Sequence, residues 1–194
     1  MEQKKNKLLS DMIQNDTDKK MVQLVEAATD LSCGDICTLL EVAHSLPFVG
    51  NLEGGDTYIN VLTREKESMV IAQYRHPNYD LYKRSIIGEI ERREDEPAVY
   101  RALEEGISGR GLIGIIDEGR TVVRHTVSPI LNSEKKVIGA LTYEYPNAGA
   151  DTESIRIINN QEGKQDPFNR QLGKASDYLQ DAILLYDANG IFVC

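Results

Sequence analysis

The sequence contains no tryptophan, and its aromatic content is only 6%. So few aromatic rings leave little surface on which nucleic-acid bases could stack. No apolar run approaches the ~20 residues that a membrane-spanning helix needs, and residues 1–16 lack the apolar core of a signal peptide. These absences argue against a nucleic-acid-binding, membrane-spanning or secreted protein.

Cysteine is scarce as well, with Cys33, Cys37 and Cys194 the 3 present. An odd and low number is typical of a reducing compartment and not of a disulfide framework. Cys33 and Cys37 lie one helical turn apart, where they could share a metal or respond to oxidation. Because zinc prefers four ligands and no His/Cys pair with ligand spacing lies nearby, we interpret them as core thiols.

Positive charge is in deficit, since 22 Lys and Arg residues face 31 Asp and Glu residues, for a net charge of −9. A chain this acidic is a poor non-specific partner for nucleic acids and anionic membranes. Its 194 residues, 41% of them hydrophobic, suffice for one domain, or one plus a fragment, with a substantial core. The composition therefore predicts a soluble, acidic, cytoplasmic domain of mixed α and β structure.

The common catalytic motifs are missing: there is no G-x-S-x-G, H-E-x-x-H or P-loop. Gly109 to Gly114 spell G-x-G-x-x-G, but a dinucleotide site needs a strand before this motif and a helix after it. Here the predicted order is reversed, so a flexible loop over 106–114 is favoured over a phosphate site. The carboxylates of 89–96 are interpreted as a solvated face. We predict no catalytic residues and no metal site.

Two helices are predicted near the N-terminus, after a flexible tail over 1–16. Met21, Leu24, Val25 and Ala28 share one helical face, and Asp16 or Thr17 is the expected cap. Ser32 begins a second helix with a variant capping box, and Pro47 with the glycine-rich stretch behind it is expected to end that helix.

Strand patterns dominate the middle of the chain. The expected elements are a hairpin of 56–63 and 68–74, a short strand within 85–90, a helix from Pro97 to Glu105, and a hairpin of 121–131 and 137–145. This order predicts an α+β fold, an antiparallel sheet flanked by helices, over residues 17–147.

Residues 148–182 read as a linker and a signalling helix. A heptad-like apolar seam runs along this helix, which is typical of a short coiled coil, although a helix packed on its own domain remains open. Beyond it, Asn189 and Gly190 form a strong hairpin-turn signal, so 183–194 are interpreted as the truncated start of another domain. The seam residues are Phe168, Leu172, Ala175, Leu179 and Ala182.

Histidines offer few candidates for a site. His44 lacks the basic residue that follows a kinase phosphoacceptor, and is interpreted as a helix-end residue. His125 lies among valines on one face of its predicted strand; both a hydrogen-bonded core histidine and a ligand-pocket histidine stay open. If a ligand pocket exists, we expect His125 and Tyr143 near its wall, with Gly139 leaving room for a ligand or another backbone.

The stretch 21–52, with Asp30-Leu31-Ser32 before a helix, resembles the N-terminal region of soluble bacterial sensor histidine kinases. The loop Ser108–Gly111 and the hairpin ending near residue 147 extend the resemblance. It implies a GAF-like sensor domain, followed from about residue 183 by the opening strands of a PAS domain. The family's kinases pass phosphate from a histidine to a response regulator, often one with an RNA-binding ANTAR domain.

The resemblance implies that this chain is the input module of such a kinase and contains no catalytic part of it. ATP and Mg²⁺ would then be cofactors of the parent kinase only, and the expected partners are a second copy of the chain, a response regulator and an unidentified small molecule. Two alternatives remain: a dimerisation scaffold without a ligand, and a small-molecule enzyme on a GAF-like fold.

Overall fold

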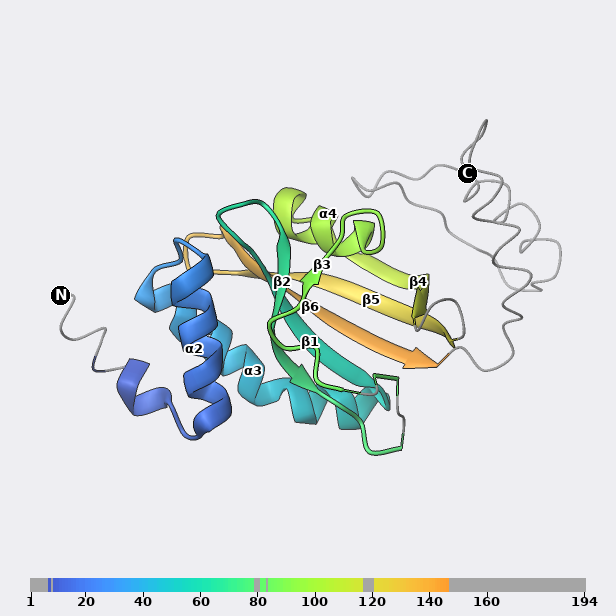
Figure 1. The fold of residues 1–194 in the computed structure, drawn as a ribbon, viewed down its shortest axis with the longest axis horizontal. Coiled ribbons are helices and arrows are strands. Elements are labelled where there is room, and N and C mark those ends of the chain that lie inside the picture. The colour runs from blue at the N-terminus through green and yellow to red at the C-terminus, as the bar shows by residue number, and fades with distance from the viewer. Residues whose placement is uncertain (1–6, 8, 79–80, 83, 117–120, 147–194) are drawn as a thin grey trace, which may run out of the picture. The chain divides into compact units, whose positions relative to one another are not determined.

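The computed structural model describes residues 7, 9–78, 81–82, 84–116 and 121–146. Six strands form one antiparallel sheet in the order β3-β2-β1-β6-β5-β4, as Figure 1 shows. The N-terminal strand β1 therefore pairs with the last strand β6 at the centre of the sheet. This confirms the predicted α+β class. The strands are β1 Asp56–Leu62, β2 Ser68–Tyr74, β3 Ile90–Glu91, β4 Gly109–Ile116, β5 Thr121–Leu131 and β6 Val137–Pro146.

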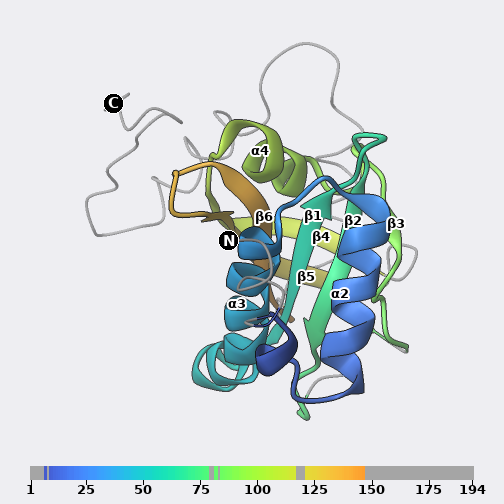
Figure 2. The same cartoon turned by 90° about the vertical axis from the view of Figure 1, so that its left-hand side faces the viewer.

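Two helices, α2 (Asp16–Ala28) and α3 (Cys33–Glu53), cover one face of the sheet (Figure 2). The cap of α2 is Asn15, one residue before the expected position. The predicted capping box at the start of α3 is confirmed: Asp35 N–H donates to Ser32 Oγ, and Ser32 N–H donates to the Asp35 carboxylate. Both helices thus begin with their first amide groups satisfied by side chains.

Of the two expected end signals of α3, the glycine-rich stretch is confirmed and Pro47 is wrong, because the helix continues to Glu53 and closes at Gly54 in the left-handed conformation. A proline costs one backbone hydrogen bond, but the turns on either side are held by packing. Leu46 is buried, and a Cβ on Gly50 would lie 2.6 Å from the Tyr74 ring. The helix therefore lies directly on β2 through this glycine, and tertiary contact outweighs the local signal.

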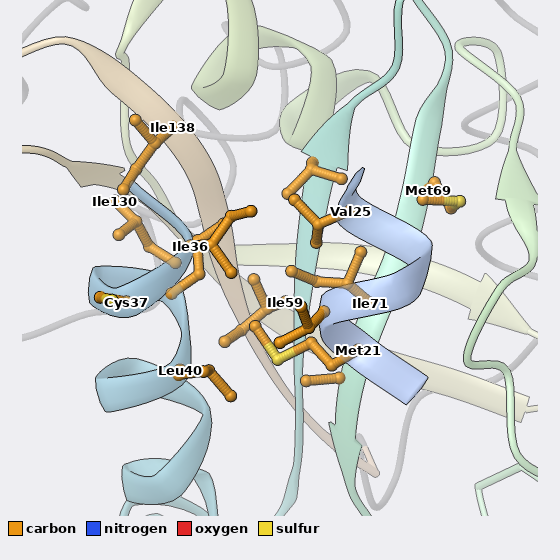
Figure 3. Packing of buried hydrophobic residues seen from close by; sticks show 14 of the residues in the cluster. Met21, Val25, Ile36, Cys37, Leu40, Ile59, Met69, Ile71, Ile130 and Ile138 are labelled. Atoms are coloured by element: carbon orange, nitrogen blue, oxygen red, sulfur yellow. The ribbon is translucent and has the colours of Figure 1, made fainter. Parts of the chain in front are cut away.

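The core between these helices and the sheet is apolar and continuous (Figure 3). Leu39, Leu40 and Val25 are fully buried there, against Ile59 and Ile71 of the central strands. Leu9 joins the same cluster and residues 9–12 are helical, so the expectation of a flexible tail is wrong for these residues. Burial of each such side chain contributes roughly 1.5–3 kcal/mol.

Among the described residues, the other face of the sheet is covered by helix α4 (Pro97–Glu105), which is present as predicted, and by the chain that leads to it. Val99, Ala102 and Leu103 of α4 pack on Val127 and Ala140. This apolar cluster is small, and the buried surface beside it is polar. The functional interest of the fold lies there.

The predicted loop over 106–114 is wrong beyond residue 108, because Gly109–Ile116 form the edge strand β4. Gly111 adopts a positive φ of 61°, at an irregularity in the pairing with β5 between Gly109 and Leu112. A glycine tolerates that conformation. The glycines of the G-x-G-x-x-G motif therefore serve a bulged strand.

No helix among the described residues is long and apolar enough to cross a membrane. The predicted linker and signalling helix over 148–182, with Phe168, Leu172, Ala175, Leu179 and Ala182, and the predicted PAS start over 183–194 lie outside the described residues.

Candidate functional site

A histidine and a glutamate lie side by side on the face of the sheet under α4. His125 of β5 and Glu144 of β6 are directly paired across the two strands, and paired residues share a face. His125 is 5% exposed and Glu144 is 0% exposed. His125 Nδ1 lies 3.6 Å from Glu144 Oε1 and 3.7 Å from Oε2 of Glu96, the residue that precedes α4.

Two tyrosines hold the Glu144 carboxylate in place. Tyr58 of β1 donates to Glu144 Oε1 at 3.0 Å, and Tyr82 donates to Oε2 at 2.6 Å. Burial raises the pKa of both tyrosines, and the neighbouring negative charge of Glu144 raises it further. The two hydroxyls therefore stay protonated and act as donors, which fixes the position of a carboxylate that has no contact with water.

A second carboxylate, Glu91 of β3, lies in the same buried layer. Its Oε2 accepts from Asn60 Nδ2 at 2.6 Å and from Ser68 Oγ at 3.3 Å. Burial, followed by the negative charge of Glu144, raises the pKa of Glu91 to about 7. The same two causes, in the same order, raise the pKa of Glu96 to about 9. Three carboxyl groups thus share a region that disfavours negative charge.

Not all polar atoms of this cluster find hydrogen-bond partners. Among the described residues, His125 Nδ1 and Glu96 Oε2 are buried without one, as are Asn60 Oδ1 and Thr142 Oγ1. Buried polar atoms are nearly always satisfied. One nitrogen and two carboxylate oxygens of Glu96, His125 and Glu144 lie within 4.8 Å of one another, so these three side chains could hold a cation.

A pocket of about 300 Å³ opens beside the cluster. Glu96 and Glu91 line both the pocket and the buried layer, and Tyr82 lies on the wall next to them. The volume is at the lower end of small-molecule sites. The cluster therefore has an adjoining space through which a small ligand or ion could enter.

The interpretation of residues 89–96 as a solvated face is wrong for two of its carboxylates. Glu91 and Glu96 are mostly buried, while Glu94 and Asp95 are exposed. The run crosses from the sheet edge to the start of α4, so successive carboxylates face opposite environments. The sequence did contain a signal for this burial, because the acidic run leads from a strand directly into an apolar helix.

The expected adjacency of the strand faces that carry His125 and Tyr143 is wrong. His125 is on the buried face as expected, but its neighbour in β6 is Glu144, and Tyr143 pairs with Thr126 on the other face. Tyr143 donates to the carbonyl of Glu53 at the end of α3. The register of the β5–β6 hairpin determines which residue of β6 lies beside His125. A shift of one residue would exchange the two faces of the strand.

Gly139 allows the backbone of a neighbouring strand to approach closely, one of the two expectations for this glycine. A Cβ at this position would lie 2.9 Å from the Asn60 carbonyl oxygen and 3.0 Å from Leu39 Cδ2. The strand β1 and helix α3 occupy that space. A role of His125, Tyr143 or Gly139 in ligand binding stays a prediction.

The remaining candidates lie on the α2/α3 side of the sheet. Cys37 is buried next to the partly buried Cys33, and burial raises the pKa of the Cys37 thiol. His44 lies in the middle of α3 and not at a helix end, with Nε2 3.1 Å from Asp18 Oδ2 of α2. Cys37 thus packs in the apolar core, and the contact between His44 and Asp18 connects α3 to α2.

This architecture, a six-stranded antiparallel sheet with helices on both faces, is that of a GAF-like domain. The family model for the GAF domain of histidine kinase PdtaS matches residues 21–162, and the chain belongs to that family. No curated protein matches the sequence.

One solved structure with a TM-score above 0.5 supports the fold, and a second match is weaker. The sensor region of a sensor histidine kinase is 16% identical, with a TM-score of 0.52 over 82% of this chain, and this chain covers 50% of it. A phycocyanobilin-bound GAF domain from a cyanobacterial phytochrome is 14% identical, with a TM-score of 0.38, over 77% of this chain and 92% of its own. This chain thus spans half the length of the first of these structures.

Proposed function

We propose that the chain is the sensory input module of a two-component histidine kinase and that the buried polar cluster under α4 reads the signal. Membership of a histidine kinase GAF family supports the first part. The observation that carries the second part is that His125 Nδ1 and Glu96 Oε2, beside an open pocket, are buried without hydrogen-bond partners in the described part of the chain. A ligand that forms hydrogen bonds with such buried groups removes the free-energy cost of leaving them unsatisfied.

A signal at this cluster has a short route to the rest of a kinase. Glu144 lies on β6 two residues before its end at Pro146, and the predicted linker begins at residue 148. Glu96 lies at the start of α4. A ligand that binds one arrangement of Glu96 and Glu144 better than another shifts the population between them, and β6 would pass that shift to the linker helix and on to a PAS domain and kinase region.

Autophosphorylation of the full parent kinase tests this proposal. Glu144→Gln and Tyr82→Phe alter the cluster, and we expect each to change the initial rate of phosphate incorporation several-fold. Tyr74→Phe is the matched control, because the Tyr74 hydroxyl donates to the exposed Asn51 side chain and lies outside the cluster. Rates that match wild type in both cluster variants, with normal thermal unfolding, contradict a sensing role for the cluster.

The partners of the signalling step are part of the same proposal. We propose a cytoplasmic parent kinase that uses ATP and Mg²⁺, phosphorylates a response regulator of the ANTAR type, and functions as a homodimer. The resemblance of residues 21–52 to that group of kinases supports this. The whole kinase is needed to test it, through transfer of labelled phosphate to candidate regulators.

The chain itself is proposed to have no catalytic activity towards ATP. Incubation of residues 1–194 with labelled ATP should leave the protein unlabelled and the ATP intact. His44, the residue with the faint phosphoacceptor context, is bonded to Asp18. Label on His44 would contradict the proposal.

A ligand-free dimerisation scaffold is a second candidate, and one observation favours it. Phe48 and Leu52 lie one helical turn apart on α3 and are 71% and 69% exposed. Sedimentation of two double variants shows which surface forms the dimer. One variant combines Phe48→Ser with Leu52→Ser, and the other combines Leu172→Asp with Leu179→Asp in the predicted seam. The scaffold reading requires one of these pairs to convert the parent dimer to monomer and the cluster variants above to leave kinase activity unchanged.

A further inference from the structure

The polar atoms of Glu96, His125 and Glu144 are spaced so that one ion or atom between them could contact all three side chains. The nitrogen-to-oxygen distances of 3.6 and 3.7 Å are too long for hydrogen bonds, which require about 2.7–3.2 Å. They suit side chains that contact a common atom between them. In a tetrahedral zinc site with bonds of about 2.0–2.2 Å, neighbouring ligand atoms lie about 3.4 Å apart.

An independent observation also indicates a missing ligand. The His125 side chain is 6% exposed, and its Nδ1 has no hydrogen-bond partner among the described residues. This nitrogen points at the two carboxylates, and Glu96 Oε2 is unpartnered as well. A Cβ at Gly114 of β4 would lie in van der Waals contact with Nδ1, at 3.7 Å, so a side chain at this position would crowd the ring.

The surroundings supply the carboxyl groups and the supporting hydrogen bonds that a cation site requires. Glu91 adds a third carboxyl group to the region, and no lysine or arginine among the described residues forms an ion pair with Glu91, Glu96 or Glu144. Tyr58 and Tyr82 donate to Glu144. Such outer hydrogen bonds orient ligating carboxylates in metal sites.

We propose that Glu96, His125 and Glu144 bind one divalent transition-metal ion, with zinc the probe for the class. One imidazole nitrogen and two carboxylate oxygens suit zinc and its neighbours, whereas Mg²⁺ and Ca²⁺ prefer oxygen ligands alone. The pocket lined by Glu96 provides the entry path and the space for water in the remaining coordination position. Metal binding itself does not depend on the proposed sensory function. Only the idea that the metal ion is the signal for the input module rests on that function.

Calorimetric titration of metal-stripped protein with Zn²⁺ tests the site. The full chain is used with Cys33, Cys37 and Cys194 each replaced by Ser, so that thiols contribute no binding. We expect one Zn²⁺ per chain, and about tenfold or greater weakening by Glu96→Gln, by His125→Gln and by Glu144→Gln. His44→Gln is the matched control, because His44 also faces a carboxylate, on the opposite side of the sheet; it should bind as the parent does.

Two further measurements keep the outcome decisive. Thermal unfolding without metal identifies any variant that fails to fold; Glu96→Gln is the safest, because Glu96 makes no capping hydrogen bond to α4. Co²⁺ bound in place of Zn²⁺ should give visible absorption bands that His125→Gln alters. Absent binding, binding that Mg²⁺ displaces at equal concentration, or binding that all three variants retain would overturn the proposal.

Failure of the metal site and failure of the sensory function are distinguishable. If Zn²⁺ binds as described but the full kinase autophosphorylates equally with and without it, the site stands and the sensory reading of it fails. If the chain binds no Zn²⁺ but Glu144→Gln still changes the kinase rate, the sensory function stands and the metal does not.

Discussion

The two faces of the central sheet differ in what they bury. The face under α2 and α3 holds a continuous apolar cluster that includes Leu40, Ile59 and Ile71. The face under α4 holds Glu91, Glu144 and His125 beside a small apolar cluster. Apolar packing maximises stability, whereas buried charge usually lowers it. This difference agrees with our proposal that the first face stabilises the fold and that the second binds a ligand.

The largest expected effect belongs to the apolar face. Leu40→Ala removes a fully buried side chain and should lower the free energy of unfolding by about 2–5 kcal/mol. Phe48→Ala, on the exposed side of the same helix, should change it by less than about 0.5 kcal/mol. Chemical denaturation measures both; equal losses would contradict the division of α3 into a packed and an exposed side.

On the polar face, Tyr82→Phe should have the next largest effect. It removes a hydrogen bond to a buried carboxylate, which typically contributes about 1.5–3 kcal/mol. Tyr74→Phe, whose hydroxyl bonds the exposed Asn51, should cost less than about 1 kcal/mol. A smaller loss for Tyr82→Phe than for Tyr74→Phe would show that Glu144 does not depend on its donors.

Glu91→Gln should change how stability depends on pH. The pKa of Glu91 is about 7 in the folded chain against an ordinary value of 4.5, so the native state holds the proton more tightly than the unfolded state. Its stabilising contribution is complete below about pH 4.5 and is lost as the pH rises towards 7. The variant keeps the acceptor for Asn60 and lacks the titrating charge.

Relative to wild type, Glu91→Gln should therefore gain roughly 1–3 kcal/mol in the free energy of unfolding between about pH 4.5 and pH 8. Denaturation curves of both proteins across this range measure the difference. Parallel pH profiles for the two proteins would show that Glu91 is not the group that titrates.

The smallest predicted effect compares the starts of the two helical covers. Ser32→Ala removes the capping box of α3 and should cost about 1 kcal/mol. Glu96→Gln should leave the start of α4 unchanged, because Glu96 makes no capping hydrogen bond. Amide hydrogen exchange in the first turn of each helix measures both effects. Faster exchange in α4 of the Glu96→Gln variant would show that the Glu96 side chain also caps the helix, which contradicts this expectation.

Local signals predicted the helices and strands better than the contacts between them. Both hairpins, the capping box at Ser32 and the helix from Pro97 follow from short-range patterns and are present in the structure. The continuation of α3 through Pro47 depends on Leu46 and Gly50 packing against the sheet. Such contacts involve residues distant in sequence, and the sequence pattern does not contain them.

The polar cluster was missed for a related reason. Its members come from β3, the start of α4, β5 and β6, and only sheet register brings His125 next to Glu144. One partial signal existed: Ala140, Thr142 and Glu144 alternate on one face of β6, and the first two of these residues favour burial there over exposure. That pattern could have indicated a buried glutamate, but not its partners.

Anomalous diffraction from crystals of the chain grown with Zn²⁺ tests the central claim, that the polar face is built for binding, most directly. The account predicts a peak about 2.0–2.2 Å from His125 Nδ1 and from one carboxylate oxygen each of Glu96 and Glu144. A peak confined to Cys33 and Cys37, or no peak near His125, would contradict it.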